Sequence, residues 1–107
     1  MASKGPLLRV FEVRTKKGCA DTLLANFATT SVDVVEGHPG NRGHFFGRCV
    51  QGGEDRVMFV SLWEDLDAVK ARFGDDWQVS YMPEGYEDLI EDCSVCHFDM
   101  SEGWSVL

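Results

Sequence analysis

The stretch RVMFVSLW at residues 56–63 decides the fold. Valine, phenylalanine and tryptophan favour extended chain, and successive side chains of a strand point to opposite faces of a sheet. Both faces of this strand are mostly apolar, with Met58, Val60 and Leu62 on one and Val57, Phe59, Ser61 and Trp63 on the other. A strand covered on one side only would alternate apolar and polar residues, so the stretch predicts a sheet that needs cover on both sides.

Residues 43–50 are predicted to pair with this strand in an antiparallel hairpin. The QGGE sequence at residues 51–54 supplies two glycines, which accept the positive φ angles of a tight hairpin turn. Further upstream, residues 7–14 form another apolar run that predicts a first strand, and the TKKG sequence at residues 15–18 ends it.

A first helix is expected between the first two strands. It covers about 15 residues from Cys19 and ends at the GHPG sequence of residues 37–40, because apolar positions recur at three- and four-residue steps. The predicted buried face consists of Ala20, Leu23, Leu24, Phe27, Ala28, Ser31 and Val35.

A second helix is predicted to begin after a cap at Asp65 and to end at Gly74. Its buried stripe consists of Leu66, Val69 and Phe73. A long connection, residues 75–91, leads to a last strand at residues 93–100. The order β-α-β-β-α-β predicts fold class α+β: a ferredoxin-like, four-stranded antiparallel sheet with both helices on one face.

The chain of 107 residues is expected to form one domain, residues 1–107, with its core at about residues 7–100. Two helices cover only one face of such a sheet. An exposed apolar face of several hundred Å² is an association site, and the simplest cover is a second copy. We therefore predict a symmetric homodimer, a dimeric α+β barrel.

The chain carries 18 Asp and Glu residues against 10 Lys and Arg residues, a formal net charge of −8. This sign repels nucleic-acid phosphates and anionic lipid headgroups, so neither nucleic acid nor membrane is expected as a partner. The absence of a long apolar run and of a signal-peptide core predicts a cytoplasmic protein. In that reducing compartment the four cysteines are expected to be free and mostly buried.

Four short motifs carry a resemblance to a known family: VRTKKG at residues 13–18, HPGN at 38–41, FVSLWED at 59–65 and VCHF at 95–98. In order and spacing they resemble the antibiotic biosynthesis monooxygenase (ABM) domain family of dimeric α+β barrels. The resemblance extends over about residues 7–100 and is more specific for fold than for chemistry, since the family holds oxygenases, haem-degrading enzymes and an isomerase.

The resemblance implies oxidation without a cofactor. In the best-studied oxygenases of this family, an electron-rich phenol or hydroquinone itself passes an electron to O₂, so no cofactor is expected. Trp63 matches a tryptophan that such enzymes keep near the substrate. Phe59 and Val69 stand where that pattern has Asn and Tyr, and Phe11 stands where the haem-degrading branch has a pocket Asn.

His97 is the predicted catalytic residue, because it falls at the histidine of the family's last-strand pattern and imidazole titrates near neutral pH. His44 is a weaker candidate, and either histidine could instead be a packing residue. Five aromatic side chains are expected to hold a flat ligand: Phe59, Trp63, Phe73, Trp77 and Tyr81. Packing in the core is the alternative for most of these rings.

No metal site is expected. The CSVCH sequence at residues 93–97 matches the C-x-x-C-H haem-attachment pattern, but residues i and i+3 of a strand point to opposite faces, so we interpret the match as chance. The other histidines and cysteines lack the paired spacing of structural zinc sites. The acidic residues that follow Phe73 are interpreted as a solvated face.

The sequence therefore predicts a small-molecule-binding homodimer that resembles cofactor-independent monooxygenases acting on aromatic or quinol-like substrates. The alternative is a non-catalytic ligand-binding or stress-related dimer of the same fold, with its cavity filled by side chains. A metal-dependent enzyme is a third interpretation.

Overall fold

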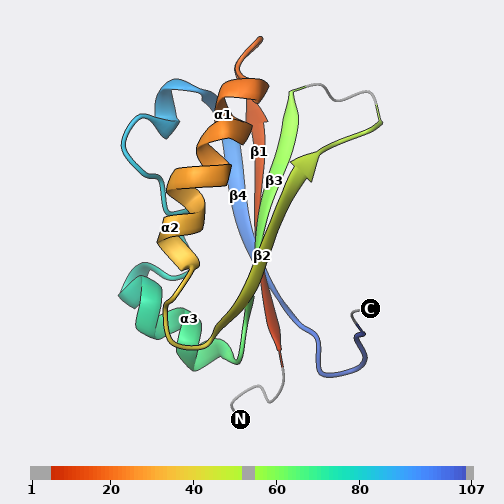
Figure 1. Cartoon of the computed structure of the whole chain (residues 1–107), viewed down its shortest axis with the longest axis vertical. Helices are drawn as coiled ribbons and strands as arrows, with labels where there is room; N and C mark the ends of the chain where they lie inside the picture. The colour runs from red at the N-terminus through yellow and green to blue at the C-terminus, as the bar shows by residue number, and fades with distance from the viewer. Residues whose placement is uncertain (1–5, 52–54, 106–107) are drawn as a thin grey trace.

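The computed structural model describes residues 6–51 and 55–105, which form a four-stranded antiparallel sheet with the helices on one face (Figure 1). In chain order the elements are β1 (Leu7–Thr15), α1 (Ala20–Asn26), the π-helical segment η1 (Phe27–Ser31), α2 (Val32–Val35), β2 (Asn41–Arg48), β3 (Arg56–Trp63), α3 (Leu66–Phe73), the 3₁₀ turns η2 (Gly74–Asp76) and η3 (Tyr86–Asp88), and β4 (Ile90–Asp99). The strand order is β2-β3-β1-β4. The predicted ferredoxin-like α+β fold is confirmed.

The structure shifts the ends of two predicted strands. β2 begins at Asn41 rather than at residue 43, because Asn41 pairs with Trp63 and its side-chain amide donates to the Leu62 carbonyl at 3.2 Å. β4 begins at Ile90, which pairs with Thr15 across a register shift in β1. The antiparallel pairing of β2 with β3 is confirmed. The glycines of the predicted hairpin turn, at residues 52 and 53, lie outside the described residues.

The first helix differs from the prediction in its geometry. Leu23, Phe27, Ser31 and Val35 are all buried, at steps of four residues. In a regular α-helix every fourth residue drifts by about 40° around the axis, so a wider turn is needed to keep this row against the sheet. The π-helical segment η1 supplies that turn. It also directs Ala28 to solvent, which makes the predicted burial of Ala28 wrong.

The second helix, α3, agrees with the prediction at both ends. The Asp65 carboxylate accepts a hydrogen bond from the Ala68 backbone N–H at 2.8 Å, which caps the helix. Gly74 ends it with a φ of 73°, a conformation that favours glycine. Val69 is fully buried against the sheet, with Leu66 and Phe73 packed around it.

The connection from α3 to β4 is fastened to the first helix by Tyr86. This ring is 1% exposed, and its hydroxyl donates to the Asn26 carbonyl at 3.1 Å. The Ser31 hydroxyl lies 2.6 Å from the Tyr86 oxygen and donates to it, since the tyrosine hydrogen is already used. Tyr86 therefore holds α1, η1 and the connection together over the same face of the sheet.

No helix or strand of the described residues covers the face of the sheet that is turned away from the helices (Figure 1). Val10 and Val60 pair at its centre, and Leu8 and Leu62 pair beside them. Phe45, Met58 and Phe98 on the same face are exposed, Phe45 and Phe98 by 53% each. The prediction of a sheet with two apolar faces is confirmed.

The cysteines are free, as predicted, but the expectation that they are mostly buried is wrong. Cys19 and Cys49 lie at the ends of elements and Cys93 is packed at the rim of the core, so these three are half-buried. Cys96 is exposed because it lies on the uncovered face. Among the described residues no helix has the length and hydropathy needed to cross a membrane.

The turn before β2 generates a stability prediction. Gly40 has a φ of +85°, and a Cβ built there lies 2.4 Å from the Ala68 Cβ, whereas Gly37 has a φ of +80° and open space around it. We expect Gly37→Ala to cost about 1 kcal/mol from backbone strain alone. Gly40→Ala should cost about 3 kcal/mol, because strain and overlap add. Urea unfolding of both variants measures this, and equal losses would show that the turn and α3 are not in close contact.

Candidate functional site

A row of polar side chains crosses the helix-covered face of the sheet. The strand register pairs His44 with Ser61, Ser61 with Arg9, and Arg9 with His97, so one residue from each strand lies in this row. We call these four residues the polar row. The neighbouring pairs are apolar: Phe11 pairs with Phe59 on β3. A line of polar groups inside an apolar layer is costly unless its members find partners.

Arg9 is the charged member of the polar row and is only 5% exposed. One guanidinium nitrogen, Nη1, donates to the Trp77 carbonyl at 2.6 Å and lies 3.0 Å from His97 Nε2. The other, Nη2, donates to the Val79 carbonyl at 3.3 Å. Within the residues that the structure describes, Arg9 forms no ion pair. Burial and the nearby Arg72 charge lower the pKa of Arg9 to about 10, so it is a cation at neutral pH.

His97 lies directly opposite Arg9 on β4. Its Nε2 accepts from the Arg9 guanidinium, which places the ring hydrogen on Nδ1. Burial, and then the Arg9 charge, lower the pKa of His97 to about 4, so the imidazole is neutral at neutral pH. The Trp77 ring meets it edge-on at a centroid distance of 5.0 Å. His97 is thus an oriented, neutral hydrogen-bond acceptor.

Aromatic rings and cations alternate above the polar row. Two guanidinium groups lie near the Phe73 ring, with the Arg9 Cζ at 3.8 Å and the Arg72 Cζ at 5.2 Å from its centroid. Arg72 also faces the Tyr81 ring at 5.6 Å and donates from Nε to the Val34 carbonyl at 2.6 Å. The ring faces compensate part of the missing negative charge through cation–π attraction.

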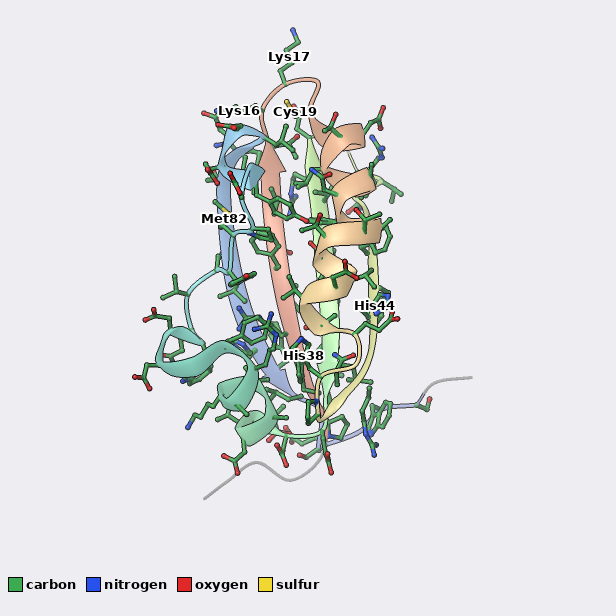
Figure 2. The ribbon with its side chains drawn as sticks, turned by 60° about the vertical axis from the view of Figure 1, so that its left-hand side comes forward. Lys16, Lys17, Cys19, His38, His44 and Met82 are labelled. Atoms are coloured by element: carbon green, nitrogen blue, oxygen red, sulfur yellow. The ribbon has the colours of Figure 1, made fainter. Side chains whose placement is uncertain are left out.

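A small cavity of about 40 Å³ lies between the polar row and the helices. It is lined by Arg9, Phe11, Ser31, Val34, Val35, Phe59, Ser61, Phe73, Tyr81 and Pro83. A volume of this size holds a few water molecules, whereas pockets for drug-sized ligands are about 300–1,000 Å³. The connection that supplies Tyr81 and Pro83 follows the β4 side of the sheet, where Met82 is labelled (Figure 2).

The structure brings the six predicted site residues into one region without placing all of them at the cavity. Phe59, Phe73 and Tyr81 line it directly. Trp63 is fully buried behind Phe73, at a centroid distance of 5.8 Å, and its Nε1 donates to Ser61 Oγ at 2.8 Å. The remaining two, Trp77 and His97, contact Arg9 at the edge of the cavity.

His44, the weaker histidine candidate, lies at the β2 end of the polar row and is labelled in Figure 2. Its ring stacks on Phe59 at 6.0 Å with an angle of 8° between the planes. Its Nδ1 is buried and has no hydrogen-bond partner among the described residues. His44 does not line the cavity, so Phe59 separates it from the space a ligand would take.

The sequence reasoning missed Arg9, Arg72 and the two serines at the cavity. A signal for Arg9 was present: it occupies an inward position of the apolar run LLRVFEV at residues 7–13, where a charge is costly. Arg72 lies in the last turn of α3, where basic residues are common, so it gave no comparable signal. No group of three or more His, Cys, Asp or Glu residues suited to a metal occurs in the described part of the chain.

The lowered pKa of His97 predicts how stability changes with pH. The folded protein keeps His97 neutral down to about pH 4, whereas in the unfolded chain it titrates at about 6.5. The unfolded state therefore binds more protons between these values, and acidification from pH 7 to pH 4 removes stability. We expect His97→Gln to lose less unfolding free energy over this range than the parent protein. Parallel losses in urea titrations would contradict the assignment.

Comparison with known proteins identifies a matching family and several structures of similar fold. The family model described as antibiotic biosynthesis monooxygenase matches residues 6–76. No curated protein matches the sequence significantly. Among solved structures, protein SO0527 from Shewanella oneidensis has a TM-score of 0.69 and 19% identity, covering 92% of this chain and 93% of its own. The heme-degrading protein Rv3592 from Mycobacterium tuberculosis has a TM-score of 0.66 and 23% identity, covering 96% and 99%.

A third similar structure is SnoaB, a cofactor-independent oxygenase from Streptomyces nogalater, solved as a mutant. Its TM-score is 0.63 and its identity 15%, over 87% of this chain and 90% of its own. At these identities the solved structures establish a shared fold rather than a shared activity. The family model, in contrast, covers well over half of the sequence. The chain belongs to the antibiotic biosynthesis monooxygenase family.

Proposed function

We propose that this protein is a homodimer that binds a small aromatic or quinol-like molecule between the polar row and the helices and oxidises it with O₂ without a cofactor. One observation carries the proposal: Arg9 and Ser61 of the polar row line a cavity walled by aromatic rings, and His97 is hydrogen-bonded to Arg9 at its edge. Small-ligand sites have this composition, an apolar wall with a few oriented polar groups. A cytoplasmic location stays a prediction.

The cavity is closed over the proposed binding position by the connection between α3 and β4. Tyr81 is 48% exposed and Val79 is 61% exposed, so little packing holds this part of the connection down. Its carbonyls at Trp77 and Val79 are bound to Arg9. Movement of residues 77–83 would enlarge the cavity while leaving the sheet floor in place, as lids over active sites do.

The proposed oxidation requires few groups from the protein. An ionised phenol passes one electron to O₂, and the resulting superoxide joins the ring radical to give a hydroperoxide. Loss of water then leaves a carbonyl, so a ring C–H, the phenolic O–H and O₂ become two C=O groups and H₂O. The protein must position the ring, remove the phenolic proton and exclude bulk water. SnoaB, which has a similar fold, is described as a cofactor-independent oxygenase, and this supports the proposal.

His97 is the proposed proton acceptor and Phe59, Phe73, Trp77 and Tyr81 are the proposed ring contacts, with Trp63 buttressing Phe73. The Nε2 atom of His97 already accepts from Arg9. When a substrate oxygen takes the Arg9 hydrogen bonds, Nε2 becomes free to accept the phenolic proton. Its low pKa in the closed protein keeps the imidazole in the unprotonated form that this step requires.

The uncovered apolar face supports the homodimer. Besides its exposed phenylalanines, this face carries a groove of about 580 Å³ near the β2–β3 hairpin. Both signs of charge lie along the groove, with Glu12 and Asp92 beside Arg14, Arg48 and Arg56. A surface with an apolar centre and both charge signs at its rim is suited to a twofold contact with its own copy.

A non-catalytic ligand-binding or stress-related dimer is the second candidate. The small volume of the cavity favours it, since about 40 Å³ is too small for an aromatic molecule unless the connection moves. The two candidates differ in oxygen chemistry: the first consumes O₂ with a hydroquinone, and the second only binds.

Oxygen uptake with a panel of naphthohydroquinones tests the proposed function. We expect the protein to accelerate O₂ consumption over spontaneous oxidation in buffer with EDTA. His97→Ala should slow the reaction about a hundredfold, the usual contribution of a general base. His38→Ala is the matched control, because His38 lies on the turn after α2 (Figure 2) and should leave the rate unchanged. An unchanged rate in His97→Ala would remove this assignment.

A further inference from the structure

We infer that the cavity recognises an oxyanion, so that the ligand is an aromatic molecule carrying a carboxylate or an ionised phenol that binds to Arg9. This inference rests on the proposed function and specifies the class of its ligand. Arg9 lies on the floor of the cavity beside the rings that would hold the rest of such a molecule.

The first argument is the charge of Arg9. Arg9 is 5% exposed, and among the described residues its guanidinium has only carbonyl groups, a neutral imidazole and a ring face as partners. Buried charges in proteins are normally paired, because desolvation is expensive. No carboxylate of the described residues lines the cavity, and Arg72 adds a second cation, with its Cζ 5.2 Å from the centroid of the Phe73 ring. A bound anion would supply the missing counter-charge.

The second argument is that two neighbouring groups at the cavity have unused hydrogen-bond donors. Arg9 has five N–H donors, and three of them have acceptors within the described residues. Ser61 Oγ accepts from Trp63 Nε1, and its own hydroxyl hydrogen has no acceptor in the described part of the chain. Arg9 and Ser61 are neighbours in the polar row. These two adjacent groups can together donate hydrogen bonds to an acceptor-only group such as an oxyanion.

The third argument concerns the carbonyls that now occupy Arg9. The Trp77 and Val79 carbonyls belong to the connection that closes the cavity, not to the sheet. A carboxylate forms stronger, charge-assisted hydrogen bonds with guanidinium than a neutral carbonyl does. An anionic ligand would therefore replace these carbonyls and release the connection, which links binding to the opening that an aromatic ring needs.

Calorimetric titration at pH 7 with 2-naphthoate and its neutral isostere 2-naphthamide tests the inference. We expect the acid to bind about ten- to a hundredfold more tightly than the amide, the gain of hydrogen bonds to a charged group. Arg9→Gln should abolish this preference, so that the acid and the amide bind to this variant with equal affinity. Arg14→Gln should preserve it, because Arg14 lies on the same strand but on the opposite face. The same titration with 4-nitrophenol, an acidic phenol, is then compared with that of neutral phenol. This comparison shows whether the site prefers an ionised phenol or requires a carboxylate.

Ser61→Ala provides a second variant if Arg9→Gln fails to fold, and it should weaken the acid several-fold and the amide not at all. Equal affinity of the wild-type protein for acid and amide overturns the inference. So does a preference that survives Arg9→Gln. If the amide binds and hydroquinones are oxidised while the acid gains nothing, the proposed function stands and the oxyanion inference fails. If neither naphthalene binds, the cavity does not open and both fail.

Discussion

The structure depends on a sheet whose two faces both avoid water. Helical segments α1, η1, α2 and α3 cover one face, and their side chains complete the core with Val57, Phe59 and Trp63. No element among the described residues covers the other face, where Val10, Val60 and the exposed phenylalanines lie. Apolar area contributes about 25 cal/mol per Å² when it leaves water, so a second apolar layer provides a large driving force for association. The fold of one chain and its proposed assembly therefore have the same cause.

Burial of the polar row inside this apolar layer costs free energy of folding. A buried arginine without a carboxylate is an unusual choice for stability alone, and replacing such groups by apolar ones is often neutral or stabilising. Here the cost is offset by two carbonyls of the connection, by His97 and by the Phe73 ring. Those same partners arrange the site: Arg9 fixes the tautomer of His97 and holds the connection closed. Conflict between local stability and placement is characteristic of functional sites.

Much of the fold could be predicted from the sequence because its signals are local. The two apolar faces of residues 56–63, the Asp65 cap and the Gly74 stop each depend on one element alone, and the structure confirms them. The π-helical turn was not predictable, since a four-residue apolar spacing also fits a regular helix within its tolerance. The burial of the cysteines was predicted from their residue type alone. The strand register instead decides that Cys96 faces outward.

The site could be predicted only in part. Aromatic residues and His97 were recognisable as types, but the polar row exists only when the strand order aligns one residue from each strand. Arg9 was missed for a different reason. A single arginine in an apolar run is easily interpreted as an outward-facing residue, although the alternation of side chains along β1 places it on the inner face. Trp63 shows the limit of a motif match, because the motif gives its location but not that Phe73 stands between it and the cavity.

Sedimentation equilibrium of the unmodified protein, over a dilution series at neutral pH, tests the two-faced sheet most directly. The account predicts a species of twice the chain mass of 12.0 kDa, with the uncovered face of the sheet protected from solvent. A stable species of 12.0 kDa throughout the series, folded and with that face open to water, would contradict it.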